Sequence, residues 1–201
     1  MSRIPTIESA NAPQPVTALY EAVQQKLGLV PNMVKALGNS AASLQGYLGL
    51  SGAVSSGILR PVTREKIALR VAELNECDYC LSAHTAIGGL LKIPADELVA
   101  ARAGDSADAK EQAILNLVQS VLETRGNVPD AAYESAQDAG VSPEEATEVV
   151  AHVALNVFTN YFNRFAQTEI DFPKVESGLA AAAAWRRRVA SAAVSPPKKR
   201  S

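Results

Sequence analysis

The sequence predicts an all-α protein, and three observations support this fold class. Apolar residues recur at helical spacing, as Ile67, Val71 and Leu74 do within "RPVTREKIALRVAELN". Residues that commonly start or end helices flank these runs, such as Ser142 followed by Pro143. No segment shows the alternation of apolar and polar residues that is typical of a strand. We therefore expect helices packed around a shared core.

The N-terminal half predicts helices in close succession. We expect them over residues 17–27, 31–37, 40–56, 60–75 and 76–91. Gly28 and Gly38 are suited to end the first two, because glycine readily adopts the left-handed conformation that follows a helix. Thr63 is a candidate N-cap of the helix over residues 60–75. Asn75 can end that helix and cap the next one, which contains Gly88 and Gly89.

The C-terminal half continues the helical pattern, with helices expected over residues 94–104, 107–125, 129–140 and 142–167. Pro94 and Pro129 suit the first turn, where a missing N–H costs nothing. Gly126 and Gly140 suit the ends. Pro173 interrupts the pattern, and an Ala-rich helix follows. We divide the chain into an extended arm (1–15), a helical domain (16–175), and the Ala-rich helix with a basic, disordered tail (176–201).

Composition places the chain among ordinary globular proteins. It has 201 residues, of which 47% are hydrophobic and 20% charged, and a formal net charge of −2. This charge argues against a nucleic-acid partner. No apolar stretch reaches the roughly 20 residues of a membrane span. The N-terminus lacks the apolar core of a secretory signal, so we expect a cytoplasmic protein.

Both cysteines of the chain lie in "NECDYCLSAHTAIGG", at Cys77 and Cys80, with His84 four residues later. On a helix, residues three and four apart share one face, so these three side chains are expected together. The first turn of a helix stabilises a thiolate, because its N–H groups are free and its dipole is positive there. In a reducing compartment, such a pair is more often catalytic or metal-binding than structural.

The pair suits two-electron chemistry. A thiolate attacks a peroxide oxygen and becomes a sulfenic acid, which the second thiol converts to a disulfide. A neighbouring histidine can take or supply the proton. Two alternatives stay open. The pair can serve thiol–disulfide exchange or redox sensing without peroxidase turnover, or Cys77, Cys80 and His84 with a carboxylate can hold zinc in a helical interaction protein.

The spacing E-x(11)-C-x-x-C-x-x-x-H, read here as "EKIALRVAELNECDYCLSAH" from Glu65 to His84, resembles the catalytic motif of the alkylhydroperoxidase D (AhpD) and carboxymuconolactone decarboxylase superfamily. The segment "VFTNYFNRFAQTEIDFP" looks like the branch that is called peroxidase-related. The resemblance covers roughly residues 20–175. It implies an AhpD-like helical bundle, a homo-oligomer, and peroxidase activity toward hydrogen peroxide or organic hydroperoxides.

The resemblance also implies roles for individual residues. Cys80 would attack the peroxide, Cys77 would resolve the sulfenic acid, and His84 with Glu65 would form a proton relay. Members of the family carry a histidine just before the second cysteine, whereas this chain has Tyr79, a neutral residue that can still donate a hydrogen bond. A thiol or dithiol reductant is implied, and no cofactor or metal. Because the decarboxylase branch lacks the cysteine pair, lactone decarboxylation is not expected.

The helix over residues 142–167 contains other notable side chains. Phe158, Tyr161, Phe162 and Phe165 form one stripe, which indicates core or subunit interface. His152 lies among valines and reads as a core or interface histidine, with an acid–base role as the alternative. Asn156 and Asn160 are polar positions in this apolar helix that either satisfy backbone groups or face the site.

Overall fold

The computed structural model describes residues 2–179, and this part of the chain is all-α as predicted, with nine α-helices and no β-strand. A short 3-10 helix (Ser9–Asn11) precedes them. The helices are α1 (Gln14–Leu27), α2 (Asn32–Leu37), α3 (Ala41–Ser55), α4 (Pro61–Leu74), α5 (Asp78–Leu90), α6 (Ala95–Ala103), α7 (Ala109–Thr124), α8 (Asp130–Asp138) and α9 (Pro143–Ala166). Within the described residues, no helix is both long and apolar enough to cross a membrane.

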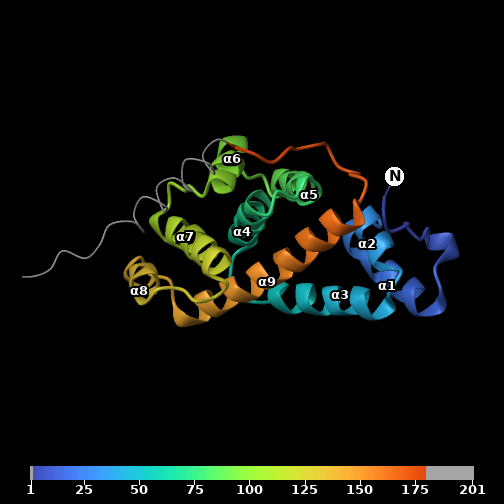
Figure 1. The fold of residues 1–201 in the computed structure, drawn as a ribbon, viewed down its shortest axis with the longest axis horizontal. Coiled ribbons are helices and arrows are strands. Elements are labelled where there is room, and N and C mark those ends of the chain that lie inside the picture. Colours follow the sequence, from blue (N-terminus) through green and yellow to red (C-terminus); the bar gives the residue numbers. More distant parts are fainter. Residues whose placement is uncertain (1, 180–201) are drawn as a thin grey trace, which may run out of the picture.

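Helix α4 lies at the centre of the bundle, where it packs against α5, α6, α7 and α9 (Figure 1). A helix with neighbours on all sides removes even its polar side chains from water. Every residue of α4 from Lys66 to Glu73 is accordingly buried. One apolar core, which includes Leu44 and Leu81, joins α1, α2 and α3 to α5. A second, which includes Ile67 and Val118, joins α4 to α7 and α9.

The beginning of α9 agrees with the sequence prediction. Ser142 accepts a hydrogen bond from Glu145 N–H (3.1 Å), and the Glu145 carboxylate accepts one from Ser142 N–H (2.9 Å). This capping box satisfies two N–H groups that have no partner within the helix. A further polar cap, Asp108, begins α7.

The predicted N-cap of α4 is wrong. The helix begins at Pro61, so Arg60 occupies the cap position and Thr63 lies within the first turn. Proline is favourable at this position because its ring presets the helical φ angle and no N–H is lost. Thr63 is buried, and its hydroxyl donates instead to Glu111 Oε1 (3.3 Å).

The start of α5 also differs from the prediction. Asn75 ends α4 as expected, but it does not cap α5. Glu76 turns the chain with a left-handed φ of +53°, and Cys77 N–H donates to Ala72 C=O (2.9 Å). Cys77 itself is the N-cap of α5. The turn between the two helices therefore places a cysteine where a Ser or Asp commonly lies.

The terminal segments pack onto the bundle. Helix α1 begins at Gln14 rather than at Thr17, and Arg3 N–H donates to Ala166 C=O (2.7 Å), which ties the arm to the end of α9. The segment after α9 runs back over α5 toward α6 (Figure 1). There the buried Glu73 carboxylate accepts from Gly178 N–H (2.8 Å). The predicted Ala-rich helix and basic tail lie largely outside the described residues, which end at 179.

Candidate active site

The two cysteines lie next to each other at the start of α5. Both are free thiols and both are buried. Cys77 is in an extended conformation, so its side chain folds back over the first turn, and its Sγ accepts a hydrogen bond from Cys80 N–H (3.4 Å). A sulfur that accepts a main-chain N–H at a helix start is stabilised as a thiolate. The predicted cysteine pair is thus brought together in this structure.

Helix α9 supplies the other wall of the site through the segment "NYFNR" (160–164). Asn163 Nδ2 donates to Cys80 Sγ (3.3 Å). Asn160 is fully buried, and its Oδ1 accepts from Asn75 Nδ2 (3.1 Å). Arg164 donates to the Asn75 and Glu76 carbonyls and thereby holds the turn that precedes Cys77. One face of α9 therefore contacts both the turn before Cys77 and the Cys80 thiol, through the residues at positions i, i+3 and i+4 (160, 163 and 164).

Glu65 and His84 form a hydrogen-bonded pair. Helix α5 folds back against α4, which brings Glu65 Oε2 to 2.7 Å from His84 Nδ1. Both side chains are partly buried, with 16% and 23% of their areas exposed. A carboxylate on Nδ1 orients the imidazole and leaves Nε2 for proton transfer. The sequence predicted this pair only through the family resemblance, because Glu65 lies nineteen residues from His84 along the chain.

The surroundings shift the pKa values of three of these groups. Burial and then the nearby Cys77 raise the pKa of Cys80 well above its usual value, although Asn163 and Asn160 act in the opposite direction. The hydrogen bond with Cys80 lowers the pKa of Cys77, against the effect of burial, and the charge of His84 assists. The surroundings therefore favour a thiolate at Cys77 over one at Cys80.

The surroundings also shift the pKa of His84. Burial by itself would lower it, but the charge of Glu65 and its hydrogen bond raise it above the ordinary value. The imidazole is accordingly protonated up to a higher pH than a free histidine. A cationic His84 paired with Glu65 can supply a proton to a leaving group.

Tyr79 lies away from this proton relay. Its side chain is buried, its hydroxyl accepts from Met33 N–H (3.1 Å), and its ring meets Phe172 edge-on with centroids 5.8 Å apart. Burial raises the pKa of Tyr79, so the phenol stays neutral. These contacts attach α5 to α2 and to the segment after α9. The structure does not bring Tyr79 to the Glu65–His84 pair.

Tyr47 and His152 lie on other sides of the site. Burial raises the pKa of Tyr47 on α3, and the charges of Cys80 and Glu65 add to this rise, although a hydrogen bond with Ser51 opposes it. His152 is buried in α9 as expected, and burial lowers its pKa. Its Nε2 has no hydrogen-bond partner among the described residues. Asn156 donates to His152 C=O (2.8 Å), so this asparagine satisfies backbone rather than facing the thiols.

A small cleft opens beside Cys77. Its volume is about 200 Å³, and it lies between the start of α5 and the end of α9. Cys77, Asn163, Arg164 and Thr168 are among its lining residues. A larger groove of about 360 Å³ lies next to α1, but its lining includes Tyr20 and Gln24 and neither cysteine nor histidine. Of these two cavities, only the smaller one is lined by a residue of the dithiol, Cys77.

Sequence reasoning found four of the residues that meet here and missed others. Cys77, Cys80 and His84 were recognisable by helical spacing, and Glu65 by the family motif. Asn163 and Arg164 were missed. A signal was visible, because they follow Asn160 at positions i+3 and i+4 of an apolar helix. Across residues 2–179, no group of three or more His, Cys, Asp or Glu side chains is arranged to hold a metal ion.

Comparison with known proteins agrees with this arrangement. The profile of the carboxymuconolactone decarboxylase family matches residues 41–119, which include Glu65, Cys77, Cys80 and His84. No curated protein sequence matches the chain. Several solved structures do.

One similar structure is an AhpD-core, peroxidase-related protein from Ralstonia eutropha JMP134, with 25% identity and a TM-score of 0.76, over 85% of this chain and 92% of that one. A peroxidase-related protein from Silicibacter sp. TM1040 has 21% identity and a TM-score of 0.72, over 83% and 88% of the two chains. A cysteine-to-alanine variant of the debrominase Bmp8, in complex with 2,3,4-tribromopyrrole, has 19% identity and a TM-score of 0.71, over 92% and 96%.

The last two likenesses show the fold alone, whereas the family profile covers the residues of the site itself. The chain is therefore similar to the carboxymuconolactone decarboxylase family over the residues of the site, and to an AhpD-core protein over most of its length.

Proposed function

We propose that this protein is a thiol-dependent peroxidase that reduces hydrogen peroxide or organic hydroperoxides through Cys77 and Cys80. One observation carries the proposal: two buried free thiols lie at the start of α5, where Cys77 Sγ accepts from Cys80 N–H, and His84 of the same helix is hydrogen-bonded to Glu65. This combination provides a nucleophile, a resolving thiol and a proton donor within about two turns of helix.

The proposal keeps Cys80 as the attacking residue, which the resemblance implies, although the surroundings favour the thiolate at Cys77. The two assignments agree if the Cys80 proton moves to Cys77 Sγ as the peroxide approaches. Cys80 then carries the charge, and it is the sulfur that receives the Asn163 amide hydrogen bond (3.3 Å). Hydrogen bonds to the charged form favour that form, so the donor assists this shift.

The steps balance as follows. Cys80 thiolate attacks the terminal oxygen of ROOH, the O–O bond breaks, and Cys80 sulfenic acid and an alkoxide form. The alkoxide takes the proton held by Cys77 and leaves as ROH. Cys77 thiolate then attacks Cys80 sulfur, the disulfide forms, and the departing hydroxide takes a proton from His84 to become water. A thiol or dithiol reductant returns the disulfide to two thiols.

The experiment is a thiol titration before and after one equivalent of cumene hydroperoxide, with zinc measured in the same sample. Rapid loss of both thiols without zinc is expected. Cys80→Ser should lower the rate of peroxide consumption at least about 10³-fold, since serine cannot form the sulfenic acid and the proposal gives Cys77 only the resolving role. Cys77→Ser should leave a sulfenic acid that dimedone traps. If Cys80→Ser still turns over peroxide, the assignment is wrong.

The same experiment separates the alternatives. Thiols that peroxide oxidises no faster than free cysteine would favour thiol–disulfide exchange or redox sensing. One zinc per chain would favour a metal-binding protein, which would then lose its fold on chelation. Because the debrominase resembles this chain in fold alone, dehalogenation is not part of the proposal.

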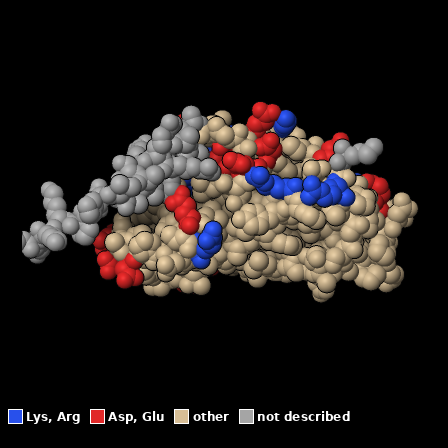
Figure 2. Space-filling model, in the orientation of Figure 1, with Lys and Arg blue, Asp and Glu red and all other residues tan. Residues whose placement is uncertain are grey.

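The proposal includes a cytoplasmic homo-oligomer. Helix α3 contains no charged residue and buries only Leu44 and Val54 within the chain. Beside it, α9 leaves Phe158 and Tyr161 39% and 61% exposed. Figure 2 shows the surface over α3 as a broad area with few charged side chains. Apolar faces of this extent support contact with another copy of the chain.

A further inference from the structure

Among the buried polar atoms near the dithiol that lack hydrogen-bond partners within residues 2–179, two belong to residues that line the small cleft. They are Asn163 Oδ1 and Thr168 Oγ1. Only 3% of Asn163 and 8% of Thr168 is exposed, and both residues line the 200 Å³ cleft together with Cys77. Leaving a buried polar group without a partner costs about 1–3 kcal/mol. Such groups are retained where a ligand or water completes them.

Asn163 is connected to the reacting sulfur as well as to the cleft. Its Nδ2 donates to Cys80 Sγ (3.3 Å), and its Oδ1 is the free acceptor of the same planar amide. A hydroperoxide differs from most other oxidants in presenting an O–H on the oxygen that is attacked. The amide can therefore hold the sulfur with its N–H and the attacked oxygen with its carbonyl at the same time.

Thr168 supplies the complementary group. The Thr168 N–H donates to Asn163 C=O (3.1 Å), so the backbone at the end of α9 fixes the threonine next to the asparagine. Its hydroxyl is a donor and an acceptor without a described partner. In the cleft it can donate to the second peroxide oxygen, on which negative charge develops as the O–O bond breaks.

We propose that the cleft between α5 and α9 is the hydroperoxide subsite, in which Asn163 Oδ1 accepts the peroxide O–H and Thr168 Oγ1 donates to the leaving oxygen. The inference rests on the proposed function and adds two residues to it. The S–O bond forms while the amide holds the attacked oxygen, both O–O electrons leave with the threonine-bound oxygen, and that oxygen takes the proton of Cys77, which lines the same cleft.

Two variants and two matched controls test the subsite. Thr168→Val removes the cleft hydroxyl, and Thr159→Val removes another buried hydroxyl of this region, which donates to Asn156 C=O (3.1 Å). Asn163→Ala removes the amide at the thiol, and Asn156→Ala removes a buried amide two turns away. For each protein the single-turnover rate of oxidation by hydrogen peroxide and by cumene hydroperoxide is measured without a reductant. The rate of alkylation by iodoacetamide is measured in parallel, with circular dichroism as the test of folding.

We expect Thr168→Val to slow oxidation by both peroxides about tenfold, because one hydrogen bond to developing charge is lost, and to leave alkylation unchanged. Asn163→Ala should slow oxidation about 100-fold and alkylation by less, because it loses both the peroxide acceptor and the donor to sulfur. Both controls should keep the wild-type ratio of oxidation to alkylation. If the cleft variants keep the wild-type ratio of oxidation rate to alkylation rate, the proposed subsite is wrong.

Failure of the proposed function gives a different pattern. In that case the wild-type protein itself reacts with peroxide no faster than free cysteine does, and the subsite falls with it. If wild type reacts rapidly and the cleft variants do too, the peroxidase stands and only the subsite is wrong. Asn163→Asp, which keeps the acceptor but loses the N–H, should retain more peroxide selectivity than Asn163→Ala.

Discussion

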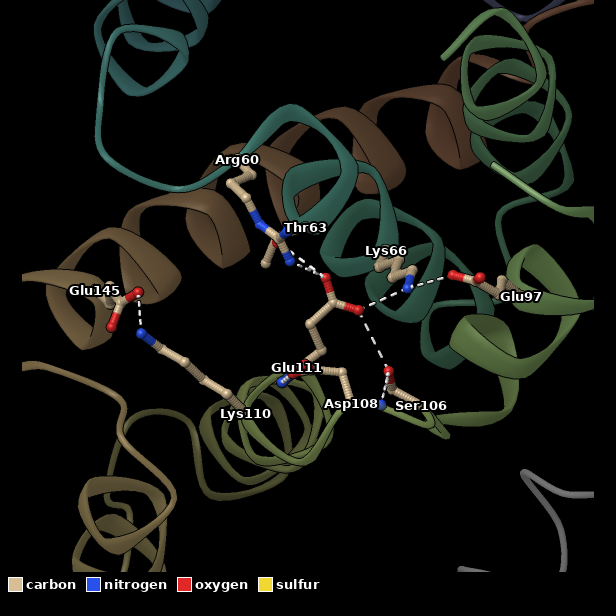
Figure 3. Close-up of polar contacts among 9 residues, drawn as sticks. All are labelled: Arg60, Thr63, Lys66, Glu97, Ser106, Asp108, Lys110, Glu111 and Glu145. Carbon is tan, nitrogen blue, oxygen red and sulfur yellow. Dashed lines mark hydrogen bonds and ion pairs between the residues drawn. The ribbon is translucent and has the colours of Figure 1, made fainter. Parts of the chain in front are cut away.

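Two neighbouring residues of α4, Glu65 and Lys66, belong to polar sites of opposite character. Glu65 points to His84 and the thiols, whereas Lys66 points to a charged cluster between α4 and α7. In that cluster, Lys66 Nζ donates to Glu111 Oε2 (2.6 Å) and the Arg60 guanidinium donates to Glu111 Oε1 (2.8 Å), as Figure 3 shows. Thr63 and Ser106 also donate to Glu111, each at 3.3 Å.

The difference between the two sites lies in how completely their buried groups are paired. In the Glu111 cluster, both carboxylate oxygens have several donors, and Lys66 also contacts Glu97 (2.8 Å). At the thiol site, Asn163 Oδ1 and Asn160 Nδ2 have no hydrogen-bond partner in the part of the chain that the structure describes. A satisfied buried network holds helices in register, whereas an incomplete one leaves room for a reactant. The following predictions test this contrast.

The largest stability effect is expected at Glu111. Glu111→Ala should lower the free energy of unfolding by about 3 kcal/mol, because Lys66 stays buried with a single, half-exposed partner. Urea denaturation measures this change. The folded variant should keep the wild-type rate of Cys80 oxidation. A matching loss of thiol reactivity at full folding would show that the two sites are not independent.

Glu65→Gln should slow thiol oxidation rather than lower the stability of the fold. It removes the charge that raises the pKa of His84, so single-turnover disulfide formation should slow about 100-fold at neutral pH. In wild type the rate should fall as the pH rises through the raised pKa of His84, since the proton donor is then lost. In Glu65→Gln this fall should move to lower pH. Glu97→Gln, at a residue of α6 that pairs with Lys66, serves as the control and should leave the pH profile unchanged.

Acid should weaken the structural cluster by a smaller amount. Burial acts to raise the pKa of Glu111, but Lys66, Thr63 and Arg60 outweigh it and hold the pKa below its ordinary value of 4.5. A carboxyl whose pKa is lower when folded adds stability above its unfolded pKa and loses it as the pH falls through its folded pKa. Unfolding curves of wild type and Glu111→Gln should therefore converge below pH 4.5. The exposed Glu134→Gln should follow wild type throughout.

The smallest effect on thiol chemistry is expected at the apolar face of α3 and α9. Tyr161→Asp places a charge on this face, so the oligomer should dissociate in sedimentation experiments while single-turnover oxidation stays within about twofold. Leu90→Asp, at a residue 84% exposed on the end of α5, is the control and should not change the oligomer. Dissociation that also abolishes oxidation would mean that a second copy completes the site.

Helical periodicity and turn residues were sufficient for the fold class and for most helix boundaries. Ser142 and Pro143 marked the start of α9 correctly, because capping depends on residues within one turn. Thr63 and Asn75 misled as caps, since Pro61 and the turn at Glu76 decided where those helices begin. Capping residues predict a helix start poorly where a second local feature, such as a nearby proline or turn, also determines it.

The sequence by itself determined that Cys80 and His84 share one helical face, because a helix places residues four apart together. It also placed Cys77 next to them, although as the extended N-cap of α5 rather than on that face. Only the tertiary structure decided that Glu65 reaches His84, that Asn163 reaches Cys80, and that Thr168 closes the cleft. These contacts depend on how α4, α5 and α9 pack. The burial that they create raises the pKa of Cys80, whereas the hydrogen bond between the two cysteines lowers that of Cys77. Burial is a property of neighbours that lie far apart in the chain, so the sequence alone does not reveal it.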